Sequence, residues 1–339
     1  SEFPWIRNHD HSDQKEVSDW LNLEIKDFCD YLSPSRAEIV ARNAAVKRLR
    51  KIVHDLWPDA ELSVFGSFAT DLYLPGSDID MVVLSPSGKY SNKVFLFQLA
   101  NKFKALKVCK SIEVIAKARV PIIKMVDTET NIHIDISFEK EGGVQAAELI
   151  NSWIEDIPSL RYLVMVIKQF LSARKMNNVH NGGMGGFSVI CIVYSFLKLH
   201  PKVASGYIDP SENLGVLLIE FFELYGKHFN YDMVALRMKE GCGYFSKRTN
   251  PEMQGKNSFI LAIEDPNDSS NNISRGTYNI RFLKKAFAGA YGLLTQRCYD
   301  LEDMTYKERI GQSILGAIVK LKGPVRDFID STGEIANLA

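Results

Sequence analysis

The spacing of apolar residues changes partway along the chain and predicts two kinds of architecture. In the first part, helical intervals alternate with short β-like runs. The elements expected there are helices over 12–32, 35–57 and 91–107, and strands over 61–66, 78–84, 111–126 and 131–138. From about residue 144 onward the periods are long, and helices are expected over 144–156, 158–175, 185–199, 213–226, 280–297 and 306–321. The pattern therefore predicts a mixed sheet with helices, followed by a mostly helical domain.

Length and composition agree with two domains and limit the partners and the cellular compartment to be expected. The chain has 339 residues and 46% hydrophobic composition, which is enough for two cores. Its 41 basic and 41 acidic residues cancel, so nucleic-acid binding would need local patches or a partner. The five cysteines include no C-x-x-C pair, which argues against a disulfide framework or a zinc site and favours a reducing compartment. The longest apolar run, Phe187 to Leu197, is shorter than the roughly 20 residues of a membrane span, so no membrane association is expected.

Three aspartates are the strongest candidates for chemistry. Asp78 and Asp80 stand where a predicted strand begins, and because side chains alternate along a strand, both point to the same side. In "NIHIDISF" the isoleucines take one face and leave Asp135 on the other, beside the first two aspartates if the strands are neighbours. Carboxylates without thiolates suit Mg²⁺ or Mn²⁺. For an isolated D-x-D pair, an acidic strand end at the surface is the more common explanation.

The stretch "FGSFATD" precedes these aspartates and has the features of a phosphate-binding loop. Gly66 lets a phosphate approach the backbone, and Ser67 offers a hydroxyl. The residues that follow can start a short helix whose free N–H groups attract an anion. A phosphate and a metal ion would then share one site.

This order of motifs resembles the DNA polymerase beta-like nucleotidyltransferase superfamily: Gly-Ser, about ten residues, Asp-x-Asp, then a third Asp on a later strand. The resemblance covers nearly the whole chain, through "KARVPIIK", "IHIDISFE", "VIKQFLSARKMNNVHNGGMGGFS", "NLGVLLIEFFELYG" and "NNISRGTYNI". Together these motifs are similar to the noncanonical nuclear poly(A) polymerases, which in the TRAMP complex add short A tails to RNAs destined for the exosome.

The resemblance implies an α+β fold with a mixed-sheet nucleotidyltransferase domain, a mostly helical central domain and an active site in the cleft between them. The domains expected are N-terminal helices at 1–43 that pack with the central domain, a catalytic domain at 44–147, and a central domain at 148–339. A loop at 264–279, rich in turn-forming residues, would recognise the nucleotide.

The activity implied is template-independent transfer of AMP from ATP to RNA 3′ ends by two-metal-ion catalysis. Asp78 and Asp80 would bind both Mg²⁺ or Mn²⁺ ions. Asp135 would bind only the catalytic ion and would orient or deprotonate the attacking 3′-hydroxyl. Gly66 and Ser67 would hold the β- and γ-phosphates.

Lys168 in "VIKQF" matches the triphosphate-binding lysine of such enzymes, although by itself it would be read as a solvated helix lysine. Relatives often carry a second lysine four residues later, where this chain has Ser172. Arg174 and Lys175 are the candidates to supply that charge.

The motif "GGMGGFS" also departs from the family, since many relatives have Ser-Tyr where this chain has Gly186 and Phe187. Phe187 still offers a π face on which a base can stack. Ser188 either replaces the missing hydroxyl contact or bonds to the backbone of its own helix.

Base choice is implied by "EDPNDSSNNISRG", in which Asp265 and Asn271 align with the recognition loop. Uridylyltransferase relatives usually carry histidine at the position of Asn271, so its absence favours ATP. The alternative is that Asn271 and Asn272 only make turns, as asparagines commonly do.

The chain shows no zinc knuckle, RNP sequence or KH loop, and its neutrality predicts weak, salt-dependent RNA binding. The chain has two local basic clusters, and each is either a solvated face or a contact for RNA. The first is Lys117, Arg119 and Lys124, and the second is Arg275, Arg281, Lys284 and Lys285. The resemblance implies a zinc-knuckle RNA-binding subunit on the helical domain, an RNA helicase of the same complex and a functional link to the nuclear exosome. It also implies a location in the nucleus, the nucleolus included.

Three other functions fit these residues less well. A terminal uridylyltransferase is disfavoured by Asn271. A catalytically inactive RNA-processing scaffold is disfavoured by the intact cluster of Asp78, Asp80 and Asp135. A glycosyltransferase that binds a nucleotide sugar through D-x-D and Mn²⁺ leaves Gly66, Ser67 and Asp135 without a role.

Overall fold

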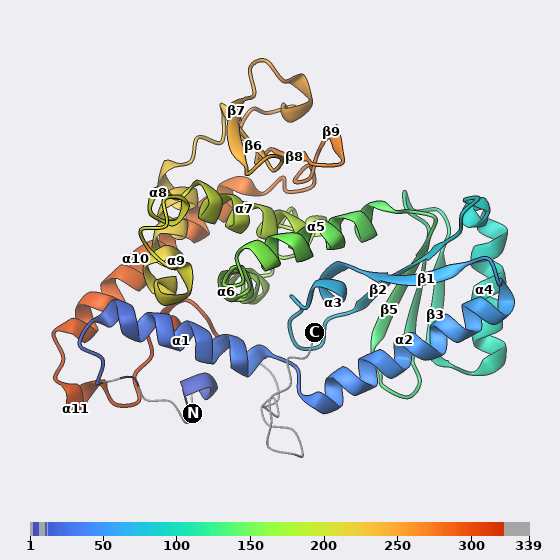
Figure 1. The fold of residues 1–339 in the computed structure, drawn as a ribbon, viewed down its shortest axis with the longest axis horizontal. Coiled ribbons are helices and arrows are strands. Elements are labelled where there is room, and N and C mark those ends of the chain that lie inside the picture. The colour runs from blue at the N-terminus through green and yellow to red at the C-terminus, as the bar shows by residue number, and fades with distance from the viewer. Residues whose placement is uncertain (1–2, 7–10, 12, 322–339) are drawn as a thin grey trace. The chain divides into compact units, whose positions relative to one another are not determined.

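The structure is a computed structural model that describes residues 3–6, 11 and 13–321. The chain divides into two compact units (Figure 1). One contains Leu32–Ser152 and is built around a sheet. The other joins the described residues up to Tyr31 to the described residues 153–321 and is mostly helical. The domain boundaries predicted at residues 43 and 147 stay predictions.

The first unit holds a five-stranded mixed sheet in the order β1-β2-β5-β4-β3. Its strands are β1 (Glu61–Phe65), β2 (Ile79–Leu84), β3 (Cys109–Ile115), β4 (Ile122–Asp127) and β5 (His133–Phe138). Strands β2 and β5 pair in parallel, and the other neighbours pair antiparallel. The predicted run over 111–126 forms β3 and β4, so the mixed sheet expected from the sequence is confirmed.

Helices α2 (Arg36–Leu56) and α4 (Lys93–Leu106) cover one face of this sheet and form its core. Ser35 caps α2 by accepting a hydrogen bond from the backbone N–H of Glu38. The odd-numbered residues of β2, beginning with Ile79, lie in this core. Since side chains alternate along a strand, Asp80 points to the face that α2 and α4 do not cover.

The second unit is made mainly of α1 (Val17–Leu32), the end of α5 (Gly142–Asp156), α6 (Leu160–Ala173), α7 (Gly186–Leu199), α8 (Pro201–Ala204), α9 (Leu214–Glu223) and α10 (Ile280–Glu302). A buried aromatic cluster joins three of them: Phe170 of α6, Phe222 of α9 and Phe287 of α10 have ring centroids 5.1 to 6.1 Å apart. Within the described ranges, no helix is long and apolar enough to cross a bilayer.

The helix expected over 306–321 is wrong. The chain forms only the short α11 (Tyr306–Arg309) and a 3-10 turn over Leu315–Ala317. The buried carboxylate of Glu24 accepts hydrogen bonds from the backbone N–H groups of Ile314 (2.8 Å) and Leu315 (3.1 Å). Because these donors are taken by a side chain of α1, tertiary contact replaces helical bonding in this segment.

A second, four-stranded sheet was not expected from the sequence. It contains β6 (Val234–Arg237), β7 (Gly243–Ser246), β8 (Ile263–Asp265) and β9 (Asp268–Asn272), in the order β7-β6-β8-β9. The polar stretch over 264–279, expected to be a loop, therefore begins as the hairpin β8-β9. Its second strand reads "DSSNN" and lacks the apolar alternation by which strands are recognised.

Candidate active site

Gly66 lies at the junction of β1 and the short helix α3 (Gly66–Thr70). Its φ of +69° lies in the left-handed region, which strains residues with a side chain. A Cβ added at this position would lie 2.8 Å from Oδ2 of Asp80, closer than atoms pack. Glycine is therefore required both by the turn and by the approach of the backbone to the carboxylate. The phosphate-loop residues and the first aspartate strand meet at this point.

The register of the sheet places the aspartates in one row. Asp80 pairs with Asp135 across the parallel strands β2 and β5. Phe65 lies opposite Asp80 on β1, and Lys124 lies opposite Asp135 on β4. Residues directly opposite one another share a face, so the row runs Phe65, Asp80, Asp135, Lys124. The condition set by the sequence, that the two aspartate strands be neighbours, is met.

The carboxylates of this row influence one another. Burial, and then the negative charges of Asp135 and Asp78, raise the pKa of Asp80 to about 6 against the opposing charge of Lys124. Burial also raises the pKa of Asp135, with Lys124 opposing and Asp78 adding to the shift. Asp78 precedes β2 and is exposed. A cation in this row would relieve the repulsion that adds to the effect of burial on both pKa values.

The donor set suits a hard divalent cation, because it offers carboxylate oxygens and no thiolate. Among the residues that the structure describes, however, no three His, Cys, Asp or Glu side chains lie close enough together to hold a metal ion as they stand. The structure thus brings Asp80 and Asp135 into register, with Asp78 within electrostatic reach, but does not close the three into a ligand cage. Their role as metal ligands stays a prediction.

A cavity of about 760 Å³ opens in the same unit. It is lined by Phe65, which shares the row of Asp80, and by Ser137, which lies two residues beyond Asp135 on the same face of β5. Arg119, from the connection between β3 and β4, adds a positive charge to its lining. The cavity is wide enough for part of a nucleotide.

The second group of predicted residues lies in the helical unit, and Lys168 is its cationic member. A Cβ added at Gly186 would lie 3.5 Å from Nζ of Lys168, so the ammonium group of α6 lies beside the first residue of α7. Burial lowers the pKa of Lys168 to about 8. The structure therefore brings Lys168, Gly186 and the next residue, Phe187, together.

Arg174, one candidate for the second triphosphate cation, is engaged elsewhere. Its guanidinium lies 3.7 Å from the ring centroid of Phe170 and donates hydrogen bonds to the backbone oxygens of Phe170 and Ile318. Arg174 thus stabilises the end of α6, which leaves Lys175 as the candidate.

Ser188 follows Phe187 in α7, and its buried hydroxyl accepts a hydrogen bond from the hydroxyl of Ser274 at 2.8 Å. This contact is neither of the two foreseen from the sequence. It connects the start of α7 to the segment just after β9. Because Ser274 follows β9, which carries Asn271, the bond connects the end of the hairpin to the first turn of α7.

The two asparagines of β9 have different surroundings. Asn272 is buried and holds the hairpin through bonds to the backbone of Ile263, Leu261 and Ser274. Asn271 is only partly buried, and its amide donates to Oδ2 of Asp265 at 3.1 Å. The structure therefore pairs the two residues predicted to recognise the base. The turn-making role weighed for both asparagines applies to Asn272.

Sequence reasoning placed two residues of these sites outside its candidates. Lys124 was grouped only with a basic cluster, although its alternation within "PIIKMV" put it on the exposed face of β4. Trp153, buried at the end of α5, was not among the predicted site residues, yet its ring lies against that of Phe187 with centroids 6.3 Å apart. No local signal in the sequence marks that contact, because it joins two helices.

Known proteins of similar sequence and structure identify the family. A domain described as "Poly(A) RNA polymerase, mitochondrial-like, central palm domain" matches residues 21–155, and "Cid1 family poly A polymerase" matches residues 213–271. A solved structure, described as the polymerase core of TRAMP, an RNA surveillance complex, is 57% identical with a TM-score of 0.87 and covers 95% of this chain and 100% of its own. The chain belongs to the noncanonical poly(A) RNA polymerase family. The α+β prediction, a palm domain with a helical region, is confirmed by this membership.

Two relatives show how the chain compares with whole members of this poly(A) RNA polymerase family. Poly(A) RNA polymerase protein 2 of Saccharomyces cerevisiae is 57% identical over 341 residues, which cover 100% of this chain but 58% of that protein. The chain therefore spans little more than half the length of that relative. A Drosophila melanogaster relative, 34% identical over 81% of this chain and 68% of its own length, is named an inactive noncanonical poly(A) RNA polymerase, Trf4-2.

Proposed function

We propose that the chain is a template-independent polynucleotide adenylyltransferase that transfers AMP from ATP to the 3′ ends of RNA. The observation that carries this proposal is the parallel register of Asp80 with Asp135, next to Gly66, where an added Cβ would lie 2.8 Å from Oδ2 of Asp80. Such a row suits phosphoryl transfer, because acidic ligands and a phosphate-binding backbone converge on one point. The names of the relatives support the same assignment.

In this proposal Asp78 and Asp80 hold two divalent ions, Mg²⁺ or Mn²⁺, and Asp135 shares one of them. When bound, the ions supply a cation for the triphosphate and lower the pKa of the attacking hydroxyl. Asp135 accepts a hydrogen bond from the 3′-hydroxyl and orients it. Gly66 and Ser67 bind the β- and γ-phosphates through the backbone and the serine hydroxyl, and the Lys168 ammonium adds a positive charge to the triphosphate.

Phe187 provides the face on which the base stacks, and Asn271 reads the edge of the base. The hydrogen bond from Asn271 to Asp265 occupies one amide hydrogen and leaves the side-chain oxygen as an acceptor. An acceptor at that point matches the exocyclic amino group of adenine, which supports ATP as the substrate over UTP.

The proposed partners follow from what the chain lacks. With 41 basic and 41 acidic residues, it has no excess charge for RNA phosphates. We assign the missing affinity to a zinc-knuckle RNA-binding subunit on the helical unit, joined by an RNA helicase, as in a TRAMP-type complex. The A tails would mark nuclear RNAs for degradation or processing by the exosome. We propose the nucleus, nucleolus included, as the location of the protein, which imaging of the tagged whole protein would test.

Primer extension tests the proposed activity. The whole protein, with and without a zinc-knuckle partner, is given a labelled RNA oligonucleotide, Mg²⁺ or Mn²⁺, and each nucleoside triphosphate separately. We expect extension with ATP that disappears in the Asp80→Asn variant. Preference for UTP would overturn the base assignment, and no addition of any nucleotide, even with the partner, would favour an inactive scaffold.

A further inference from the structure

Three aromatic rings form a continuous stack at the start of α7. Phe187 lies against Trp153 with centroids 6.3 Å apart and an interplanar angle of 28°. Trp153 in turn lies against Tyr194, about two helical turns further along α7 than Phe187, with centroids 4.7 Å apart and an angle of 11°. Trp153 is therefore held between two residues of α7 and fills the space between them from α5.

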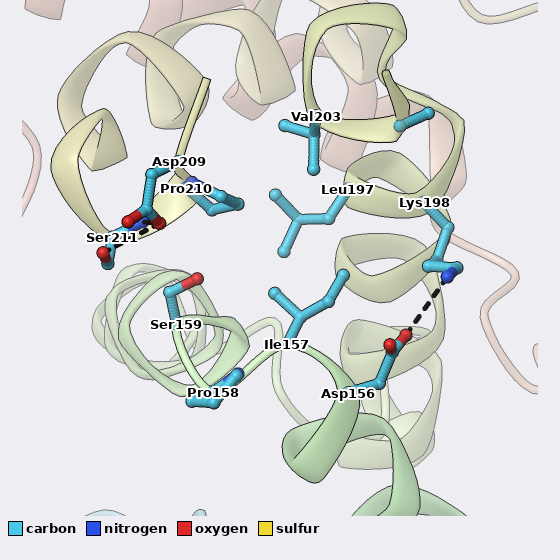
Figure 2. A pocket seen from close by; sticks show the side chains of 11 residues that line it. Asp156, Ile157, Pro158, Ser159, Leu197, Lys198, Val203, Asp209, Pro210 and Ser211 are labelled. Carbon is cyan, nitrogen blue, oxygen red and sulfur yellow. Dashed lines mark hydrogen bonds and ion pairs between the residues drawn. The ribbon is translucent and has the colours of Figure 1, made fainter. Parts of the chain in front are cut away.

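The far end of the stack is anchored by polar contacts. The Tyr194 hydroxyl donates to Oδ2 of Asp156 at 2.7 Å, and the same oxygen pairs with Lys198 Nζ at 3.2 Å. The hydrogen bond from Tyr194 is the main cause that lowers the pKa of Asp156. Figure 2 shows Asp156 and Lys198 joined at one side of a cavity of about 540 Å³, whose middle is lined by Ile157, Leu197 and Val203. The anchor is therefore reached from solvent, while the rings of Trp153 and Tyr194 are 5% and 6% exposed.

Phe187 is the least restrained member of the stack. It is only partly buried, and it follows Gly185 and Gly186, which have no side chains to pack beside it. The first turn of α7 has no side-chain cap. One face of the Phe187 ring meets Trp153, so the plane of the ring depends on that contact.

We propose that Trp153 is a positioning residue for nucleotide binding: held by Tyr194, it fixes the ring of Phe187 in the plane on which the base stacks. This inference rests on the proposed function, in which Phe187 contacts the base. Stacking free energy depends on the alignment of the two π faces. A Phe187 ring that is free to rotate about its side-chain torsions must be ordered when the nucleotide binds, and this weakens binding without touching the reacting atoms.

A double-mutant cycle on the whole protein tests the proposal. We expect Phe187→Leu to raise KM for ATP about twentyfold with kcat within about twofold, because one stacked base is lost. Trp153→Leu is expected to raise KM about fivefold, again with little change in kcat, and Trp153→Phe to restore most of the loss. In the Phe187→Leu background, Trp153→Leu should change KM by less than about twofold, because its effect acts through that ring.

Phe287→Leu is the matched control. Phe287 is buried in the same unit and stacks on Phe170 with centroids 6.1 Å apart and an angle of 23°, away from Phe187. This variant should lower the melting temperature as Trp153→Leu does and leave KM unchanged. If Trp153→Leu does not fold, Tyr194→Phe replaces it, with a KM rise of about twofold expected only when Phe187 is present.

The possible results distinguish the positioning role of Trp153 from the base-stacking role of Phe187. Equal KM effects of Trp153→Leu with and without Phe187, or an unchanged KM in Trp153→Leu, would overturn the positioning role. An unchanged KM in Phe187→Leu would overturn the base-stacking part of the proposed function itself. A KM rise in Phe287→Leu as large as that in Trp153→Leu would show a general packing effect and would also overturn the inference.

Discussion

The two units carry sites of opposite character. In the sheet unit, carboxylates crowd into one row, and burial with mutual repulsion raises the pKa values of Asp80 and Asp135. In the helical unit, Asn271 and Asp265 satisfy each other by a hydrogen bond, and Phe187 rests on Trp153. In the first site the carboxylates repel one another, and a bound cation would relieve this repulsion. In the second site the polar side chains already pair with each other. We infer that the sheet unit performs the chemistry and the helical unit selects the nucleotide.

The largest expected effect is that of Asp80→Asn, which should lower the rate of AMP transfer at least about a thousandfold, since it removes a charged group from the reacting centre. The same change should stabilise the protein at neutral pH. The folded-state pKa of Asp80, about 6, lies above its ordinary value of 3.8, so the folded protein binds a proton more tightly than the unfolded chain. That contribution is present at low pH and is lost as pH rises through 6.

The stabilisation by Asp80→Asn above pH 6 has a ceiling of about 3 kcal/mol, from a shift of about two pKa units at 1.36 kcal/mol each. Denaturant unfolding at pH 5 and pH 8 measures it. Asp59→Asn, an exposed carboxylate of the same unit paired with Lys89, is the control and should gain no stability. A less stable Asp80→Asn variant at pH 8 would show that the row is not under repulsion.

The Gly66→Ala variant is expected to lose less of the rate of AMP transfer than Asp80→Asn. The added Cβ would lie 2.8 Å from the Asp80 carboxylate, and φ of +69° would be strained by about 1–2 kcal/mol. Gly76→Ala is the control, since Gly76 has a similar φ of +76° with nothing within 4 Å of the added atom. Both variants should lose similar backbone stability, but only Gly66→Ala should slow AMP transfer, by about a hundredfold. Equal rates in single-turnover assays would show that the approach to Asp80 is unimportant.

The Lys168→Met variant should have a KM for ATP about tenfold higher than that of the wild type, with kcat little changed, because one charge-assisted contact is lost. Since burial lowers its pKa to about 8, the wild-type KM should rise as pH increases from 7 to 9 and the ammonium loses its proton. The Lys168→Met variant should lack this rise. A KM that increases equally in both proteins would assign the titration to another group.

The smallest change concerns base choice. Asn271→His should shift the ATP-to-UTP ratio toward UTP by about tenfold, the weight of one hydrogen bond, while the total rate stays close to that of the wild type. Asn272→Ala is the control: it should lower the melting temperature, because Asn272 holds the hairpin backbone, and leave the ratio unchanged. Competition assays with both nucleotides present measure the ratio. A ratio unaffected by Asn271→His would remove the hairpin from base selection.

The sequence predicted the sheet unit well because its signals are local. The period-two alternation in "NIHIDISF" separates the core residues from Asp135, and the five-stranded sheet has that polarity. The helical unit was predicted less completely. Hairpin β8-β9 is polar, and the segment after α11 donates backbone hydrogen bonds to the carboxylate of Glu24, which is distant in the chain. The Trp153 stack and the hydrogen bond between Ser188 and Ser274 join elements that are distant in the sequence. The spacing of apolar residues within one element does not predict such contacts.

Nucleotide binding to the Asp80→Asn variant tests most directly whether the sheet unit performs the chemistry and the helical unit selects the nucleotide. ATP and UTP would be titrated separately into the whole protein by calorimetry with Mg²⁺ present, and RNA extension would be measured on the same samples. We expect no extension, while ATP binds about tenfold more tightly than UTP, as in the wild type. Equal affinities for the two nucleotides, or extension at a rate near that of the wild type, would contradict the assignment of chemistry to one unit and selection to the other.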